Sequence, residues 1–268
     1  MPRRPAVPSP VSLAAGVDIG GSKVLAVALD EDREVLAQVR LRTSSGAAGV
    51  VESATEAVHR LAAALGVQPG DFEVVGVGVP GLVEPDSGHV DNDVNAAALG
   101  VAHVLRLDDS DVAFLSIGTG LAAGLVTNGQ LRRGARGAAG EIGHVPVDPA
   151  GPICRCGQRG CLETLASGTV RDTFAGHVAS AVRLLVLTCD VETVVLGGGV
   201  TEVGRPLIDA VVAALHRQAE SSPFLAALEL ASRVAVVPPG SAVAAIGAAL
   251  TGVAACASGD SAGLTVPR

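Results

Sequence analysis

The sequence of 268 residues has no tryptophan, no tyrosine and only four phenylalanines. Few rings are therefore available for stacking on nucleobases, and the cores must be built from small aliphatic side chains. Concentrated positive charge is lacking too: the formal net charge is -8, and no basic stripe follows the short RRP near the start. A surface for a phosphate backbone needs such a stripe, so we expect no nucleic-acid partner.

Membrane-spanning runs and an export signal are also lacking. The most apolar stretches, 183–200 and 234–250, are interrupted by charges in the first and by Pro and Gly in the second. Residues 1–12 are Pro-rich without the apolar core of a signal peptide, and we interpret them as a disordered leader. Five cysteines without an export signal favour thiols or a metal over disulfides. We therefore expect a cytoplasmic protein without a membrane partner.

A repeated pattern organises the rest of the chain. Residues 14–40 read as a strand, a Gly-rich turn, a second strand, a polar turn and a third strand, and residues 112–137 repeat this order. Further elements follow each copy: helices at 50–66, 94–105, 177–189, 205–221 and 241–256, and strands at 73–81, 192–200 and 233–240. The pattern predicts an α/β protein of two duplicated lobes, 13–108 and 109–268, with a cleft between them. The last helix, 241–256, could pack back on the N-terminal lobe.

Two Gly-rich turns, one in each copy, could bind one polyphosphate from both sides, because such turns expose successive backbone N–H groups. At the first turn, Asp18 could hold a hydrated Mg²⁺. A third Gly loop follows the strand at 192–200 and matches neither a Walker A loop nor a dinucleotide fingerprint. Ordinary hairpins are the alternative reading for either turn alone. The candidate nucleotide-binding residues are Asp18, Gly20, Gly21, Ser22 and Lys23; Gly118, Thr119 and Gly120; and Gly197, Gly198 and Gly199.

The sharpest local pattern is a cluster of metal-binding residue types, in which Gly157 and Gly160 let the chain curl back. Three thiolates and one imidazole complete a tetrahedral zinc site without an open position, so the pattern predicts structural Zn²⁺. Reduced free thiols in a loop are the alternative. The predicted zinc ligands are His144, Cys154, Cys156 and Cys161.

Two glutamates, Glu141 and Glu163, flank this predicted zinc knot at 144–161. A knot fixed by metal would hold their carboxylates rigidly, and rigid carboxylates suit the recognition of sugar hydroxyl groups. Solvated surface glutamates are the alternative for either one taken alone.

With these residues assembled, the sequence resembles the ROK family (repressors, open reading frames and sugar kinases), within the actin-like ATPase and sugar kinase superfamily. The resemblance implies the two-lobed, ribonuclease H-like fold of that superfamily. It covers most of residues 15–255, and the run 112–168 is highly specific. The matching stretches are 18–23, 76–100, 117–147, 154–163 and 194–200.

The resemblance also implies the chemistry of DNDVN, residues 91–95, which stands where the family carries a catalytic Glu-Asn-Asp. Asp93 would be the general base that takes a proton from a sugar hydroxyl as it attacks the γ-phosphate of ATP, with Mg²⁺ neutralising charge. Asn92 would hydrogen-bond ring hydroxyls, and Asp91 replaces the usual Glu. A helix cap is the alternative for Asp93, and it is compatible with catalysis.

Family members are further implied to bind sugar through the residues that match Glu141, His144 and Glu163, with His144 contacting both sugar and zinc. A ligating imidazole keeps only one nitrogen to donate, which argues against this double role. The resemblance suggests a homodimer.

Two stretches are shorter than the resemblance implies. Relatives carry a sugar-contacting loop, a helix and a strand before the catalytic motif, whereas here residues 88–90 run directly into it. A parallel crossover needs a dozen or more residues, so we expect the N-terminal lobe to lack one strand and part of the sugar floor. A second shortening follows residues 161–174, where relatives insert a helical segment.

The resulting hypothesis is an ATP-dependent kinase of a hexose, glucose or an N-acetylhexosamine. The alternative is a catalytically impaired relative that binds sugar or nucleotide without turnover, and the two shortened stretches motivate it. A DNA-binding repressor would need a helix-turn-helix that the short leader does not supply.

Overall fold

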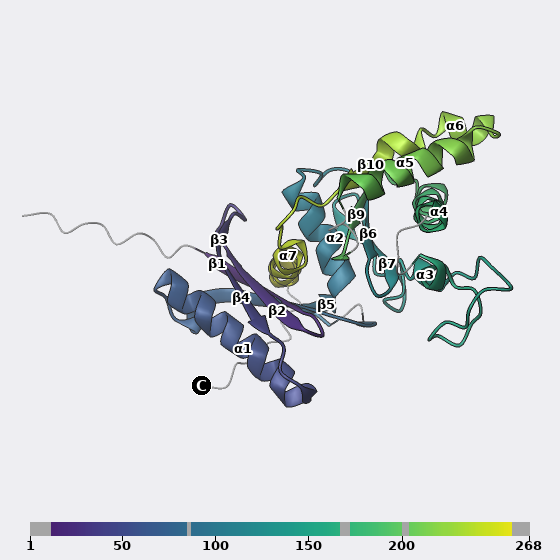
Figure 1. Ribbon diagram of the computed structural model, residues 1–268. Helices are drawn as coiled ribbons and strands as arrows, with labels where there is room; N and C mark the ends of the chain where they lie inside the picture. The colour runs from purple at the N-terminus through teal and green to yellow at the C-terminus, as the bar shows by residue number, and fades with distance from the viewer. Residues whose placement is uncertain (1–11, 85–86, 167–171, 200–203, 259–268) are drawn as a thin grey trace, which may run out of the picture.

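The computed structural model describes residues 12–84, 87–166, 172–199 and 204–258. Two sheets of five strands form its framework, one in each half of the chain (Figure 1). Within the described ranges, no helix has both the length and the apolar character needed to cross a bilayer. The expected leader lies almost wholly outside the described residues.

The N-terminal sheet begins as an antiparallel meander and continues with two strands parallel to its first strand. Helix α1 (Gly46–Leu65) covers one face and ends at Gly66, whose φ of 71° suits glycine in a helix cap. In spatial order the strands are β3 (Val35–Arg42), β2 (Lys23–Leu29), β1 (Leu13–Ile19), β4 (Phe72–Val79) and β5 (Val90–Asn92).

The C-terminal sheet repeats this arrangement, with an antiparallel meander followed by two parallel strands. The predicted duplication is therefore confirmed at the level of sheet topology. Its strands, in the matching spatial order, are β8 (Gln130–Leu131), β7 (Leu121–Thr127), β6 (Val112–Ile117), β9 (Thr193–Gly197) and β10 (Val234–Val236).

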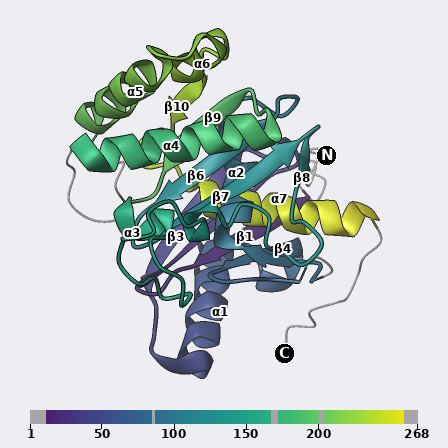
Figure 2. The same ribbon diagram turned by 90° about the vertical axis from the view of Figure 1, so that its right-hand side faces the viewer.

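Helices α2 (Asp93–Val104) and α7 (Val243–Ser258) form the layer between the two sheets (Figure 1). Helix α7 packs on β1 and β4, and α2 packs on β6 and β7. On the far side of the C-terminal sheet, α4 (Asp172–Cys189) and α5 (Arg205–Ala219) add an outer layer, as Figure 2 shows for α4. The short elements are η1 (Pro69–Asp71), η2 (Ile142–His144), α3 (Leu162–Leu165), α6 (Pro223–Ala227) and η4 (Leu230–Arg233).

Small residues allow the two middle helices to approach closely. A Cβ atom added to Gly100 of α2 would lie 1.9 Å from the carbonyl oxygen of Val243, and one added to Gly247 of α7 would lie 1.6 Å from that of Ala96. Real side chains do not occupy such distances, so the backbones touch only because glycine is present on both helices. The middle layer is thus a helix pair held by close backbone contact.

Strand β5 corrects the expectation that the N-terminal lobe lacks a strand. It pairs in parallel with the last residues of β4, Val77 with Val90 and Val79 with Asn92, and residues 80–89 connect the two strands. The short connection works because β5 has only three residues and pairs at the end of β4, so the chain need not travel the length of the sheet. The second shortened stretch includes residues 167–171, which lie outside the described ranges.

Candidate functional site

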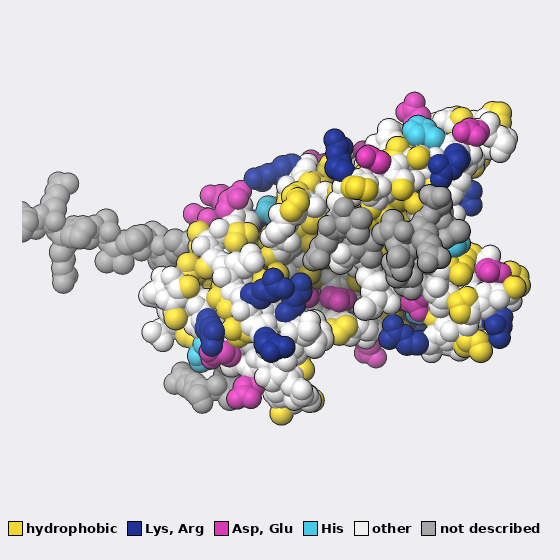
Figure 3. Space-filling view, viewed as in Figure 1, with side chains coloured by type: hydrophobic (Ala, Val, Ile, Leu, Met, Phe, Trp, Pro, Cys, Tyr) yellow, Lys and Arg dark blue, Asp and Glu magenta, His cyan; other side chains and the backbone are white. Residues whose placement is uncertain are grey.

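A cleft of about 270 Å³ opens at the ends of the C-terminal strands β6, β7 and β9. The second Gly-rich turn, between β6 and β7, and the loop after β9 both border it. The space-filling view shows an acidic patch at the central hollow of this face (Figure 3). The residues that line the cleft include Gly118, Thr119, Gly120, Glu141, His144, Glu163, Gly198 and Gly199.

Packing explains the glycines of the third loop. A Cβ atom at Gly197 would lie 2.1 Å from the ring of Phe114, and one at Gly198 would lie 2.3 Å from the carbonyl oxygen of Ile117. Gly198 also has a φ of 88°, which favours glycine. These close approaches bring the loop against the end of β6, so Gly198 and Gly199 line the same cleft as the second turn, while Gly197 is buried as part of the sheet.

The first Gly-rich turn belongs to the other sheet and lies outside the lining of this cleft. The Gly20 N–H donates to the Lys23 carbonyl at 2.9 Å, and the Thr43 hydroxyl donates to the Gly20 carbonyl at 2.7 Å. Gly21, Ser22 and Lys23 are exposed. The turn is thus held from behind by the residue after β3, while its tip faces solvent.

Two aspartates, one beside the first turn and one at the start of α2, interact through their charges. Burial raises the pKa of Asp18 to about 6, the nearby Asp93 carboxylate adds to this rise, and Lys23 opposes it. Burial also raises the pKa of Asp93, an effect that the Val94 N–H opposes and the Glu141 carboxylate reinforces. The structure therefore brings Asp18, Asp93 and Glu141, from three separate elements, into one electrostatic group.

The side chain of Asn92, the predicted sugar ligand, forms hydrogen bonds with backbone groups of the protein. Its Oδ1 accepts hydrogen bonds from the N–H groups of Val94 at 2.9 Å and Asn95 at 3.1 Å, so it is the N-cap of α2. Its Nδ2 donates to the carbonyl of Gly81 at 2.8 Å. Capping of α2 therefore falls mainly to Asn92, and the adjacent Asp93 is left at the first helical position with its carboxylate 2.9 Å from the Val94 N–H.

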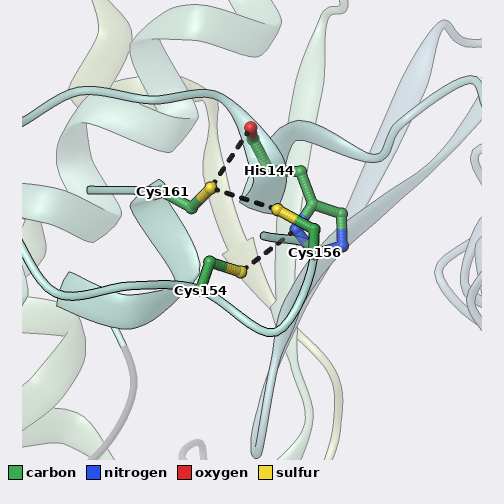
Figure 4. A group of neighbouring side chains, drawn as sticks. All are labelled: His144, Cys154, Cys156 and Cys161. Atoms are coloured by element: carbon green, nitrogen blue, oxygen red, sulfur yellow. Dashed lines mark hydrogen bonds between the residues drawn. The ribbon is translucent and has the colours of Figure 1, made fainter. Parts of the chain in front are cut away.

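The four predicted metal ligands converge in the loop between β8 and α3 (Figure 4). Cys154 Sγ lies 3.6 Å from His144 Nδ1, and Cys156 Sγ lies 3.6 Å from Cys161 Sγ. Ligands of a tetrahedral zinc ion at bond lengths of about 2.1–2.3 Å are separated by about 3.6–3.8 Å. The ligand atoms all lie within 4.8 Å of one another, so this set could hold a metal ion.

Backbone turns place the thiols. Gly157, with φ of 91°, donates its N–H to the Cys154 carbonyl at 2.9 Å, and the Cys154 N–H donates to Gln158 at 2.7 Å. At Gly160, with φ of 69°, a Cβ atom would lie 1.6 Å from the Asp148 carbonyl oxygen. These two glycines do curl the chain back, as their spacing predicted.

The cluster also orients the residues at the edge of the cleft. His144 turns Nδ1 toward Cys154 and holds Nε2 3.9 Å from the Glu141 carboxylate. Glu163 Oε1 accepts from Cys154 Sγ at 2.8 Å and lies 3.6 Å from His144 Nδ1. The two imidazole nitrogens thus face different neighbours, which makes a metal contact and a substrate contact geometrically compatible.

Sequence reasoning missed the partner of Asp91. Arg133, which follows β8, places Nε 2.7 Å from Asp91 Oδ2, and Asp91 is only 2% exposed. Asn95 Nδ2 donates to Asp91 Oδ1 at 3.1 Å. No local spacing could have revealed a contact between residues that are 42 apart and belong to different lobes. Only the combination of acid and amide in DNDVN hinted at an internal network.

Two sheets of matching topology around a middle helical layer, with Gly-rich turns and carboxylates facing a cleft, define a two-lobed actin-like ATPase fold of the sugar-kinase type. The ROK hexokinase from Thermus thermophilus shares it, with a TM-score of 0.75, 26% identity and coverage of 92% of this chain and 99% of that one. A ROK family glucokinase from Streptomyces griseus, in complex with glucose and AMPPNP, also shares this fold. Its TM-score is 0.73 and its identity 25%, and the match covers 89% of this chain and 98% of that one.

Sequence comparison identifies the family. The ROK family model matches residues 14–91 and 88–170, and the chain belongs to the ROK family. An N-acetylmannosamine kinase from Citrobacter koseri is 31% identical over 208 residues, 66% of this chain and 67% of that protein. Matches to two further curated relatives cover 56% and 58% of their lengths, so the chain spans between about half and two thirds of these proteins.

Proposed function

We propose that this protein phosphorylates a hexose, glucose or an N-acetylhexosamine, at the expense of ATP, with Asp93 as the general base. The observation that carries the proposal is the position of Asp93. Its carboxylate, at the first residue of α2, is close enough to Asp18 on one side and Glu141 on the other for each pair to interact electrostatically. Membership of a family whose matched relatives include glucokinases and N-acetylmannosamine kinases supports the reaction class.

In the proposed reaction, Asp93 accepts the proton of the attacking sugar hydroxyl. A bond forms between the sugar oxygen and the γ-phosphorus, and the bond between that phosphorus and the ADP oxygen breaks. The raised pKa of Asp93 suits a base, because a carboxylate of higher pKa attracts the proton more strongly. The other sugar hydroxyls would form hydrogen bonds with Glu141, His144 and Glu163, which line the cleft together.

The phosphates and Mg²⁺ would lie between the two Gly-rich turns. Burial, and after it the nearby Asp93 carboxylate, raise the pKa of Asp18 against the opposing charge of Lys23, and a bound cation would favour the ionised form that both of these disfavour. Asp18 would hold the ion, in keeping with the preference of Mg²⁺ for carboxylate oxygens, and the ion would neutralise charge on the transferred phosphoryl group. Thr119 and the turn amides would contact phosphate oxygens.

The cysteine and histidine cluster would hold a structural Zn²⁺. Its measured separations fit a tetrahedral site of Cys154, Cys156, Cys161 and the Nδ1 atom of His144. Closed by four protein ligands, such a site leaves no position for substrate, so the ion would act by fixing Glu141, His144 and Glu163 at the cleft.

The testing experiment is ADP release from Mg-ATP by zinc-replete protein across glucose, N-acetylglucosamine and N-acetylmannosamine. We expect sugar-dependent release that Asp93→Asn lowers by about 10²- to 10⁴-fold, the usual contribution of a general base. Asp209→Asn, an exposed aspartate on α5, is the matched control and should release ADP like the unchanged protein.

Release that does not exceed the level of Asp93→Asn, from folded protein with its metal, would reject the kinase proposal. Nucleotide or sugar binding without turnover would then favour the impaired relative. Two observations bear on that alternative: the link of residues 80–89 is short, and the Asn92 amide caps α2. Cytoplasmic location, a homodimer and the absence of a nucleic-acid partner stay predictions.

A further inference from the structure

A buried polar network lies directly beside Asp93. Asp91 Oδ2 accepts from Arg133 Nε at 2.7 Å, while Oδ1 accepts from the Asn92 N–H at 2.8 Å and from Asn95 Nδ2 at 3.1 Å. Both oxygens of this 2%-exposed carboxylate are therefore engaged. The network includes Asn92, which caps α2, and Asn95, which lies in the first turn of α2. It therefore holds the backbone on both sides of Asp93.

The cation of this network, the Arg133 guanidinium, comes from the C-terminal lobe. Arg133 follows β8 and opens the loop that ends at η2, and the Ala139 N–H donates to its carbonyl at 3.1 Å. From Ala139 the chain continues through Gly140 to Glu141 at the cleft. The arginine thus sits at one end of a loop, closed on itself by a backbone hydrogen bond, whose other end leads into Glu141.

A second contact joins the same loop to the N-terminal sheet. Gly137 has a φ of 69°, and a Cβ atom there would lie 2.2 Å from the carbonyl oxygen of Val83, in the link between β4 and β5. The loop therefore meets the segment before Asp93 at two places, once by charge and once by close backbone packing. Such a double contact resists sliding of one sheet against the other.

We infer that Arg133 is a positioning residue that joins the two lobes through Asp91 and thereby sets Asp93 and Glu141 opposite each other. A buried carboxylate without its partner is strongly disfavoured, so the pair favours the one arrangement in which the lobes meet. The inference rests on the proposed function for its kinetic consequence, but the coupling between the lobes can be measured without it.

The test compares Arg133→Gln with Arg133→Lys and with Arg132→Gln as the matched control. Arg132 is the adjacent, exposed arginine, and its Nε bonds to Thr127 on its own sheet. Since a displacement of about 1 Å can cost about a hundredfold in rate, we expect Arg133→Gln to lower kcat at least about tenfold. The KM for ATP should change less than about threefold. Arg133→Lys, which keeps the charge, should recover much of the loss, and Arg132→Gln should show none.

Hydrogen exchange supplies a readout that needs no activity. Arg133→Gln should speed exchange of peptides at 87–99, in the other lobe, and Asp91→Asn should in turn speed exchange at 133–141. If Arg133→Gln does not fold, the double variant Asp91→Asn/Arg133→Gln, which leaves no unpaired buried charge, takes its place in both measurements.

Exchange confined to the loop that carries each substitution, or unchanged kcat in Arg133→Gln, would overturn the inference. A kcat loss that only tracks the fraction of folded protein would overturn it as well. If the unchanged protein shows no sugar-dependent ADP release, the proposed function fails, while the exchange measurement still decides whether Arg133 joins the lobes.

Discussion

The two Gly-rich turns occupy the same place in two sheets of the same topology, yet they present different groups. In the N-terminal sheet Asp18 of β1 pairs with Gly78 of β4, and in the C-terminal sheet Ser116 of β6 pairs with Gly197 of β9. One lobe therefore places a carboxylate where the other places a hydroxyl. Duplication has preserved backbone geometry, and the chemistry has diverged at single positions.

The surroundings of the turns diverge in the same sense. Beside the first turn lie Asp18 and Asp93, two carboxylates of raised pKa, with Lys23 as the opposing charge. Beside the second turn lie Glu163 and His144, tied to the cysteine cluster. Under the proposed function, the N-terminal lobe supplies the ion-binding and proton-accepting groups, and the C-terminal lobe supplies the sugar-binding groups.

The largest expected effect on this comparison comes from removing, one at a time, the groups that distinguish the two turns. Asp18→Asn should lower sugar-dependent ADP release on the order of a hundredfold and raise the Mg²⁺ concentration needed for half-maximal rate, because the ion would lose its carboxylate. Ser116→Ala should lower it by no more than about fivefold, the worth of one neutral hydrogen bond. Rates titrated against Mg²⁺ for both variants decide this; equal losses would mean that the turns share the task.

The next effect concerns the metal cluster in the second lobe. Under the proposed zinc site, Cys161→Ser or treatment with a chelator should raise the KM for sugar about tenfold or more, because Glu141, His144 and Glu163 would lose their rigid support. The KM for ATP should change little if the first turn and Mg²⁺ dominate nucleotide binding. Steady-state kinetics beside metal analysis check this, with exposed Cys256→Ser as control. A loss shared equally by both substrates would argue against separate roles for the lobes.

A smaller effect is expected in the pH profile. Because burial and Glu141 raise the pKa of Asp93, the acid limb of kcat/KM should lie above the ordinary aspartate value of 3.8. Glu141→Gln removes one of the negative charges that raise this pKa, so it should move the acid limb to lower pH. Profiles of kcat/KM from pH 4 to 8 test the shift; an unmoved limb would mean that these two carboxylates do not interact.

The smallest effect is on stability. Because the folded pKa of Asp18, about 6, exceeds the ordinary aspartate value of 3.8, the folded state binds the proton more tightly than the unfolded state does, and stability falls as pH rises through this window. The full cost, on the order of 1–3 kcal/mol, is present above about pH 6, and Asp18→Asn removes it. In Mg²⁺-free buffer its Tm should exceed that of the unchanged protein by about 2–6 °C at pH 8, and by less at pH 5. Ser116→Ala should show no such pH dependence.

Most of the fold could be predicted because its signals are local. Alternating apolar residues around Gly turns mark both meanders, and helical spacing marks α1, α2, α5 and α7. The convergence of His144 with the three cysteines could be predicted for the same reason, since Cys154, Cys156 and Cys161 lie within a segment of eight residues. Strand β5 was missed because a three-residue strand leaves no periodic pattern, and its pairing depends on where β4 ends.

The candidate site divides along the same line. By itself the sequence determined which chemical groups are present: the Gly-rich turns, the DNDVN segment, the two glutamates and the cluster of one histidine and three cysteines. Tertiary structure alone decided that Asp93 lies near Asp18 and Glu141, that Asn92 caps α2, and that Arg133 neutralises Asp91. The physical reason is that spacing along the chain reports only on neighbours within a few residues. Burial, pKa and ion pairing depend instead on which distant segments the packing of two sheets around α2 and α7 brings together.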